Sequence, residues 1–236
     1  MGQSFFIWNG RDCRSMGVNL RGPVPIVRPE ERVRHVEIPG SSGDLTETEG
    51  ENIYNSYIQT ASISVRGGFR VRDVYRWLRG AGYVTFSGEP DRRQKARIIG
   101  AITLNRHSRN LDKWEGEVQF YCQPLKEMIQ EKTNEIVPGG TVRNSGDVEE
   151  KPDWSFYATG TSALISAGGK SLAITGLTAG AAYLIRSDVS MVLTADRQTD
   201  LTANSVGDFP TLEVGSNTVT GSGWSTMTVW RRERFL

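Results

Sequence analysis

The clearest pattern in the chain is a two-residue alternation of apolar and polar positions between Tyr57 and Arg66. Ala61, Ile63 and Val65 occupy one set of positions, and serine or threonine stands between them. Because successive side chains of a β-strand point to opposite faces, this alternation predicts a strand with one buried and one polar face.

The spacing of the apolar residues changes directly after this strand. Val71, Val74 and Leu78 are spaced as residues on one face of an α-helix. Gly80 is suited to end that helix, because glycine readily adopts the left-handed conformation that follows helix C-termini. The sequence therefore predicts one helix over Val71 to Arg79.

The rest of the first half is predicted to be β-structure. A strand is expected at Tyr83 to Ser87, and two alternating segments, Ala96 to His107 and Trp114 to Cys122, are expected to pair as a long antiparallel hairpin. A bulge is expected at Gly100. The side chains predicted to be chiefly buried in this hairpin are Ile98, Ala101, Phe120 and Cys122.

The second half is rich in Gly, Ser and Thr, with short apolar runs between them. Strands are expected at Trp154 to Ala158, Ser171 to Thr175, Tyr183 to Ser187, Ser190 to Thr194 and Trp224 to Arg231. Turn signals such as Gly168-Gly169-Lys170 recur every eight to twelve residues. This rhythm is typical of a β-sandwich.

The charge also divides the chain in two. Residues 1–133 have a net charge of +4, and residues 134–236 have a net charge of −3. The change falls in the segment 134–153, which is rich in Gly, Pro and acidic residues. We therefore expect a first domain at 1–133, a linker or first strand of the second domain at 134–153, and a second domain at 154–236.

Composition narrows the classes of function. The chain has 236 residues, 37% hydrophobic residues and a net charge of +1. These values favour a soluble, folded protein over a membrane-spanning or disordered one. The absence of a strong positive charge argues against dedicated nucleic-acid binding. No signal or lipidation pattern is readable at the N-terminus, and no motif calls for a cofactor.

Candidate catalytic and metal-binding groups are few. His35 and His107 have no second ligand at a spacing typical of metal sites. A Cys122/His107 pair is excluded if the hairpin forms, because the two residues then lie more than ~20 Å apart along the strands. Cys13 and Cys122 are expected to be free thiols, since nothing in the pattern brings them together. No catalytic residue is assigned.

Exposed aromatic side chains in a sandwich can bind sugars by stacking. The candidates are Trp154, Trp224 and Trp230, although strand alternation places such residues in the core at least as often. A carbohydrate-binding protein is therefore the alternative reading of the second half.

The segment from Arg32 to Gly50 has no core pattern of its own. A short β-branched run is followed by Pro39-Gly40, Gly43 and an acidic tail. Such a segment is typical of a projecting loop or hairpin arm, which needs another surface to pair its backbone groups. The residues expected to form a subunit interface are Val36, Ile38, Pro39, Gly40, Gly43, Leu45 and Thr46.

A series of short motifs occurs in order along the chain: Phe6 to Asp12, Met16-Gly17-Val18, Ile38 to Thr46, Trp77-Leu78, Tyr83, Ser87 to Asp91, Ala96-Arg97-Ile98, Val118 to Pro124, Asn144-Ser145-Gly146, Gly207 to Leu212, Gly215-Ser216-Asn217 and Trp230 to Leu236. Together these motifs resemble one protein family, the distal tail proteins (Dit) of long-tailed, non-contractile phages and prophages. Ser42 departs from the Arg expected in the loop.

The resemblance implies a structural virion protein and no enzyme. It implies a mainly β, two-domain fold: an N-terminal β-sandwich with one helix and an arm, related to the tail-tube fold, and a C-terminal galectin-like sandwich. It also implies a hexameric ring at the tail tip, with the tail-tube protein and the tail-tip hub protein as partners and DNA passing through the lumen.

The alternative assignment is a carbohydrate-binding, galectin-like module for host adsorption. Both histidines lie in the first half, so the cluster by which true galectins hold galactose is missing. The second half is also too short for an additional sugar-binding module. We therefore expect that the chain does not itself bind the host sugar.

Overall fold

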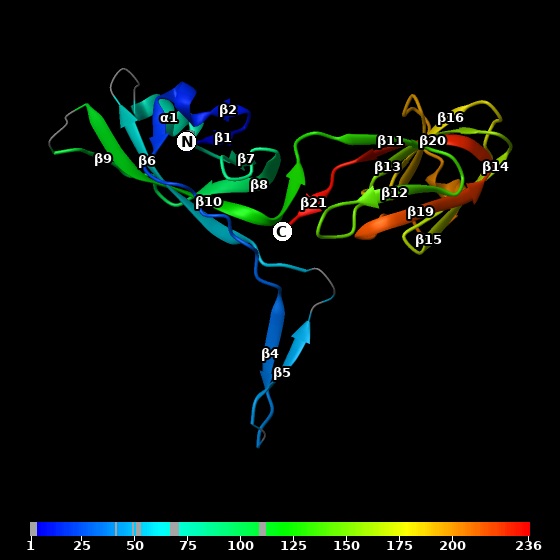
Figure 1. Ribbon diagram of the computed structural model, residues 1–236, viewed down its shortest axis with the longest axis horizontal. Helices are drawn as coiled ribbons and strands as arrows, with labels where there is room; N and C mark the ends of the chain where they lie inside the picture. Colours follow the sequence, from blue (N-terminus) through cyan, green and yellow to red (C-terminus); the bar gives the residue numbers. More distant parts are fainter. Residues whose placement is uncertain (1–3, 41, 49, 51–52, 67–70, 109–111) are drawn as a thin grey trace. The chain divides into compact units, whose positions relative to one another are not determined.

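The computed structural model describes residues 4–40, 42–48, 50, 53–66, 71–108 and 112–236. The chain is mainly β and divides into two compact units, Met1–Glu127 with Leu236, and Met128–Phe235 (Figure 1). The division precedes the expected end of the first domain at residue 133, and the segment 134–153 supplies strand residues to the second unit.

The first unit contains ten strands, one α-helix and one short 3-10 helix among its described residues. They are β1 (Phe6–Trp8), β2 (Arg11–Asp12), η1 (Cys13–Met16), β3 (Val18–Leu20), β4 (Val33–Glu37), β5 (Asp44–Thr48), β6 (Tyr57–Arg66), α1 (Val71–Trp77), β7 (Ala81–Phe86), β8 (Arg92–Ile99), β9 (Leu104–Arg106) and β10 (Lys113–Met128).

Most of these strands belong to one sheet that folds over on itself. Its order is β2-β1-β7-β8-β10-β6-β3, so β1 and β10 are three strands apart, about 14 Å in a flat sheet. Yet the rings of Phe6 on β1 and Phe120 on β10 are only 5.4 Å apart. The sheet therefore curls until β1 and β10 face each other, and the side chains between them form the core of the first unit. Helix α1 adds Trp77, whose ring stacks on Phe6 at 5.6 Å.

The strand and the helix expected first are both confirmed. Strand β6 spans Tyr57–Arg66, and its residues Ala61, Ile63 and Val65 are buried. Helix α1 spans Val71–Trp77, and Gly80 adopts a positive φ of 78° shortly after it. The spacing of hydrophobic residues was sufficient to predict both elements, because each places a single apolar face against the core.

The long hairpin of the first half differs from the expectation in one respect. The segment 96–107 is not one strand: β8 ends at Ile99, β9 begins at Leu104, and Gly100 between them has a φ of +70°. Phe120 and Cys122 are buried as expected and Ile98 is half-buried, but Ala101 is exposed. The expectation for Ala101 was wrong because the chain leaves the strand at this break.

The second unit is a sandwich of two five-stranded sheets. One has the order β11-β20-β13-β16-β17 and the other β12-β19-β14-β15-β18. The elements are β11 (Lys132–Ile136), β12 (Gly140–Asn144), β13 (Asp153–Ala158), β14 (Ser162–Ala167), β15 (Lys170–Thr175), β16 (Ala182–Arg186), β17 (Met191–Thr194), η2 (Thr202–Asn204), β18 (Ser205–Gly207), β19 (Gly215–Ser222), β20 (Trp224–Arg231) and β21 (Arg234–Phe235).

A single apolar core joins these two sheets. Trp154 and Met227 come from the first sheet, and Ile165 and Leu172 come from the second. Gly168 and Gly169 have positive φ angles of 58° and 70°, which suits the two-residue turn between β14 and β15. The expected sandwich is confirmed, and so is the mainly β, two-domain class of the whole chain.

The close approach of β9 to β10 depends on a glycine. A Cβ atom on Gly116 would lie 2.1 Å from the backbone oxygen of Thr103, which cannot move without displacing β9. We expect Gly116→Ala to lower the free energy of unfolding by about 1–3 kcal/mol. Gly22→Ala is the matched control, because its added Cβ meets nothing within 4 Å. Urea denaturation of both variants tests this, and equal midpoints would contradict it.

Candidate assembly surface: the β4–β5 hairpin

Strands β4 and β5 pair with each other as a separate two-stranded sheet, which we call the arm (residues 33–48, Figure 1). The register places His35 opposite Thr46, Val36 opposite Leu45, and Glu37 opposite Asp44. The side chains of His35 and Thr46 meet through Nδ1 and Oγ1 at 3.4 Å. The segment expected to project is therefore an antiparallel hairpin.

The local sequence explains this hairpin. The β-branched residues Val33 and Val36 favour an extended strand. Gly40 and Gly43 then adopt positive φ angles of 81° and 92°, which allows the chain to reverse direction. At its base the pairing is continued by hydrogen bonds from the Arg32 amide to the Ile53 carbonyl and from the Asn55 amide to the Glu30 carbonyl, both 2.8 Å.

The arm packs little against the described residues of its own chain. Every residue of β5 is exposed, and the side chains of Ile38 and Leu45 are 47% and 49% exposed. A two-stranded hairpin that stands alone in water is at best marginally stable. The arm therefore has the physical character of a segment that becomes ordered against another surface.

The two faces of the arm differ chemically. One face bears Val36 and Leu45, next to the pair of Arg34 and Glu47. The other face bears Thr46 with His35 and ends in the two acids Glu37 and Asp44, which lie directly opposite each other. One face is therefore partly apolar, and the other is acidic near the turn.

All seven residues predicted from the sequence fall within this one hairpin. Val36, Leu45 and Thr46 lie in its strands, and Ile38, Pro39, Gly40 and Gly43 lie in the connection between them. The sequence analysis missed Glu37 and Asp44, because their opposition depends on the register of the two strands. Their acidic character alone gave no signal, since charged residues are common on exposed hairpins.

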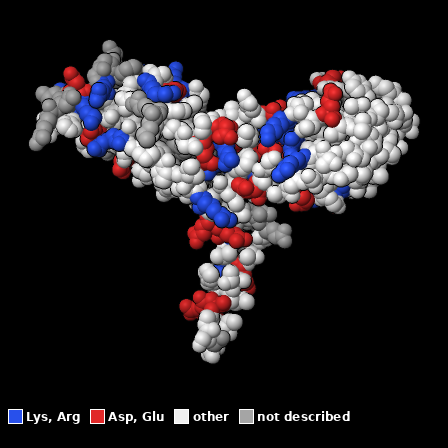
Figure 2. Space-filling model, viewed as in Figure 1, with Lys and Arg blue, Asp and Glu red and all other residues white. Residues whose placement is uncertain are grey.

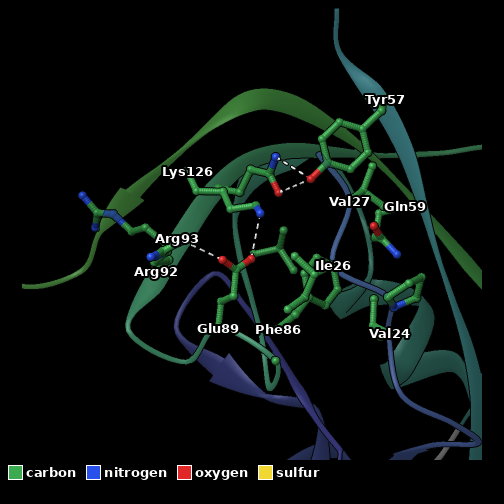
Figure 3. A pocket seen from close by; sticks show the side chains of 14 residues that line it. Val24, Ile26, Val27, Tyr57, Gln59, Phe86, Glu89, Arg92, Arg93 and Lys126 are labelled. Atoms are coloured by element: carbon green, nitrogen blue, oxygen red, sulfur yellow. Dashed lines mark hydrogen bonds and ion pairs between the residues drawn. The ribbon is translucent and has the colours of Figure 1, made fainter. Parts of the chain in front are cut away.

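A second cluster of charged groups lies in the first unit around Glu89 (Figure 3). The two carboxylate oxygens of Glu89 accept from Arg92 and Lys126, each at 2.7 Å, and Lys126 is only 5% exposed. Nearby, the Tyr57 hydroxyl donates to Gln94, and burial raises the pKa of Tyr57 to about 12. These groups pair with one another and line one pocket together with the segment Val24–Val27.

The groups suited to nucleophilic chemistry are buried or kept apart from one another. Cys13 and Cys122 are free thiols, both fully buried. Burial raises the pKa of both thiols, and that of Cys122 reaches about 12. His107 pairs through its amide with the Lys113 carbonyl, nine residues before Cys122 on β10, so the two side chains cannot meet.

No cluster of three or more His, Cys, Asp or Glu side chains that could hold a metal ion occurs among the described residues. Within the same part of the chain, no helix has the length and apolar character needed to cross a membrane.

The three candidate tryptophans of the second unit differ in exposure. Trp154 and Trp224 are buried, and their indole N–H groups donate to the Ser187 hydroxyl and the Leu164 carbonyl, both at 3.0 Å. Trp230 is half-buried and lines a cleft of about 610 Å³ together with Asp153, Ser155, Arg197 and Arg232. Only Trp230 of the three is placed to meet a ligand.

Comparison with known proteins gives no match to a family model and no match to a curated protein. Among solved structures, the chain is similar to "SPP1 Dit (gp 19.1) Protein", which is described as a paradigm of the hub adsorption apparatus in Gram-positive infecting phages. The TM-score is 0.75 at 19% sequence identity, and the alignment covers 100% of both chains. The family resemblance found in the sequence motifs is thus confirmed at the level of the fold: this chain has the fold of a phage distal tail protein along its entire length.

Proposed function

We propose that this chain is a structural virion protein, a distal tail protein that forms a hexameric ring at the tip of a phage tail. The ring joins the tail-tube protein to the tail-tip hub protein, which carries the adsorption apparatus. Phage DNA passes through its lumen during ejection. The protein is assembled with its partners in the host cytoplasm and acts in the virion.

The observation that carries this proposal is the similarity of fold to SPP1 Dit over the whole of both chains. Both units take part in it, so the likeness extends beyond one common β-sandwich. The name of that protein associates it with a hub adsorption apparatus. We infer the same kind of role for the present chain.

The arm supports assembly into a ring. A closed ring of identical subunits needs a heterologous interface, in which one patch of each subunit contacts a different patch of the next. An exposed hairpin with Val36, Ile38 and Leu45 offers one such patch, and its unpaired edges can bind a neighbouring surface. In this proposal the seven predicted arm residues form the subunit interface.

A non-enzymatic role agrees with the chemistry of the described residues. Their two thiols are buried with raised pKa values, and the charged groups around Glu89 are paired with each other. The arrangement of these groups serves packing and stability.

Negative-stain microscopy and mass photometry of the purified chain test the proposal. We expect rings with six-fold symmetry and a mass of about six chains, in a population that grows with protein concentration because assembly follows mass action. A species that remains monomeric at high concentration and in the presence of its tail-tube and hub partners would overturn it.

A second candidate function, binding of a host carbohydrate, is favoured by one observation. Trp230 and the polar groups of its cleft could stack on and hydrogen-bond to a sugar ring. We keep the expectation that the chain does not bind the host sugar. Calorimetric titration of the full chain with millimolar sugars separates the two candidates, since saturable binding lost in Trp230→Ala supports the second one.

A further inference from the structure

The acidic end of the arm has no ion-pair partner among the described residues of its own chain. Glu37 and Asp44 lie directly opposite each other, and neither forms an ion pair with any described residue. Figure 2 shows acidic side chains gathered toward the end of the arm. Like charges at opposed positions of a strand pair destabilise the pairing. A cationic surface outside the arm would relieve this repulsion.

Such a surface exists at one edge of the sheet in the first unit. A cleft of about 530 Å³ is lined by Asn19, Leu20, Arg21, Ser64, Arg66 and Lys113. Arg21 and Lys113 share a single acidic partner, Glu115, at 3.3 and 2.6 Å. Arg66 forms no ion pair with the described residues. The cleft therefore has more positive than negative charge.

The position of the cleft also suits the reception of a hairpin. Strand β3, which contributes Asn19 and Leu20, is the last strand of the sheet and pairs only with β6 among the described strands. An edge strand leaves one row of backbone groups without a strand partner. An incoming strand can thus gain backbone hydrogen bonds next to the side chains that attract it.

We propose that the acidic face of the arm, Glu37 and Asp44, docks in the cleft around Arg21, Arg66 and Lys113 of a second copy of this chain. This inference rests on the proposed ring and names the surface that receives the arm. The arm and the cleft are different parts of the chain, so the contact is heterologous and can repeat around a closed ring.

A double-mutant cycle tests this contact. In Glu37→Lys the attraction to the cleft becomes repulsion. We expect the protein concentration at which half of the chains are in rings to rise about tenfold at low salt. Arg66→Glu is expected to have a similar effect from the other side of the interface. The two changes combined in one chain should restore most of the lost assembly, because the pair is then reversed.

Glu135→Lys is the control for net charge, because it makes the same charge change at an exposed position of β11 in the second unit. It should leave assembly unchanged. Single variants that assemble like the wild type, or a combined variant without any recovery, would overturn the inference. So would a wild-type ring that dissociates in EDTA, which would place a divalent cation between the two acids.

This experiment separates the inference from the proposed function. If the wild-type chain forms no ring, the proposed function fails. A second outcome is a wild-type ring that tolerates the charge reversals but is lost when a Gly/Ser linker replaces Ile38–Leu45 of the arm. In that case the proposed function stands, and the surface that receives the arm lies elsewhere.

Discussion

Replacement of the segment Ile38–Leu45 by a Gly/Ser linker of equal length is expected to abolish ring formation while both units stay folded. The replaced side chains include Ile38 and Leu45, which are about half exposed and make no part of either core. Their loss should change the free energy of unfolding by no more than about 0.5 kcal/mol. Mass photometry should show monomers, and the thermal midpoint should match that of the wild type.

The control for this variant is the same kind of replacement at another exposed turn, Asp196–Thr199 in the second unit. That variant should still assemble. The interpretation of the arm is contradicted if the arm variant elutes as a hexamer. It is also contradicted if the arm variant unfolds, because the segment would then contribute to the core of its own subunit.

The second large effect is expected on the free energy of unfolding, and it arises from Glu150, a buried acid of the second unit. Glu150 is 2% exposed, and neither oxygen of its carboxyl group has a hydrogen-bond partner among the described residues. Burial raises its pKa from 4.5 to about 7; Arg231 lowers the pKa and the nearby Glu233 raises it. The folded protein therefore keeps this carboxyl protonated at a pH at which the unfolded chain has released the proton.

The sign of the pH dependence follows from linkage. Below pH 4.5 the carboxyl is protonated in the folded and in the unfolded state, so this site does not change the free energy of unfolding. Between pH 4.5 and about 7 only the unfolded chain ionises, and this site lowers stability as the pH rises. The loss amounts to about 3 kcal/mol at neutral pH. Glu150→Gln removes the ionisation and should be more stable than the wild type above pH 7 by a gain of this order.

Urea denaturation of both proteins between pH 4 and pH 8 measures this effect. The difference between the two curves should grow with pH and level off near pH 7. Glu149→Gln is an informative neighbour: burial raises the pKa of Glu149, but the hydrogen bond from Lys170 at 2.5 Å and other contacts leave it lowered overall. That variant should be less stable than the wild type by a nearly constant amount above about pH 5, because the lowered pKa confines the pH dependence of this site to lower pH. Parallel curves for Glu150→Gln and the wild type would refute the assignment.

The sequence was most informative where one face of an element is apolar. The strand over Tyr57–Arg66 and the strand over Trp224–Arg231 have the predicted bounds, since each alternates against a core. Strands β14 and β19 were not predicted. Their serine, threonine and glycine residues hide the alternation that the buried Ile165 and Val219 would otherwise show.

The candidate site was only partly predictable, for a different reason. The composition of the arm was enough to identify it as a projecting segment. The opposition of Glu37 and Asp44 and the meeting of Arg66 and Lys113 in one cleft depend on strand register and sheet order. Likewise, nothing local distinguishes Glu150 from the exposed Asp147 and the half-buried Glu149, because its burial arises from distant parts of the chain.

The two buried thiols have a consequence for the life cycle that we propose. A virion protein is made in a reducing cytoplasm and then acts outside the cell, where disulfides form readily. Oxidation starts from the thiolate, and burial keeps Cys13 and Cys122 protonated. The subunit should therefore keep the same covalent structure before and after lysis, and its assembly should stay non-covalent throughout.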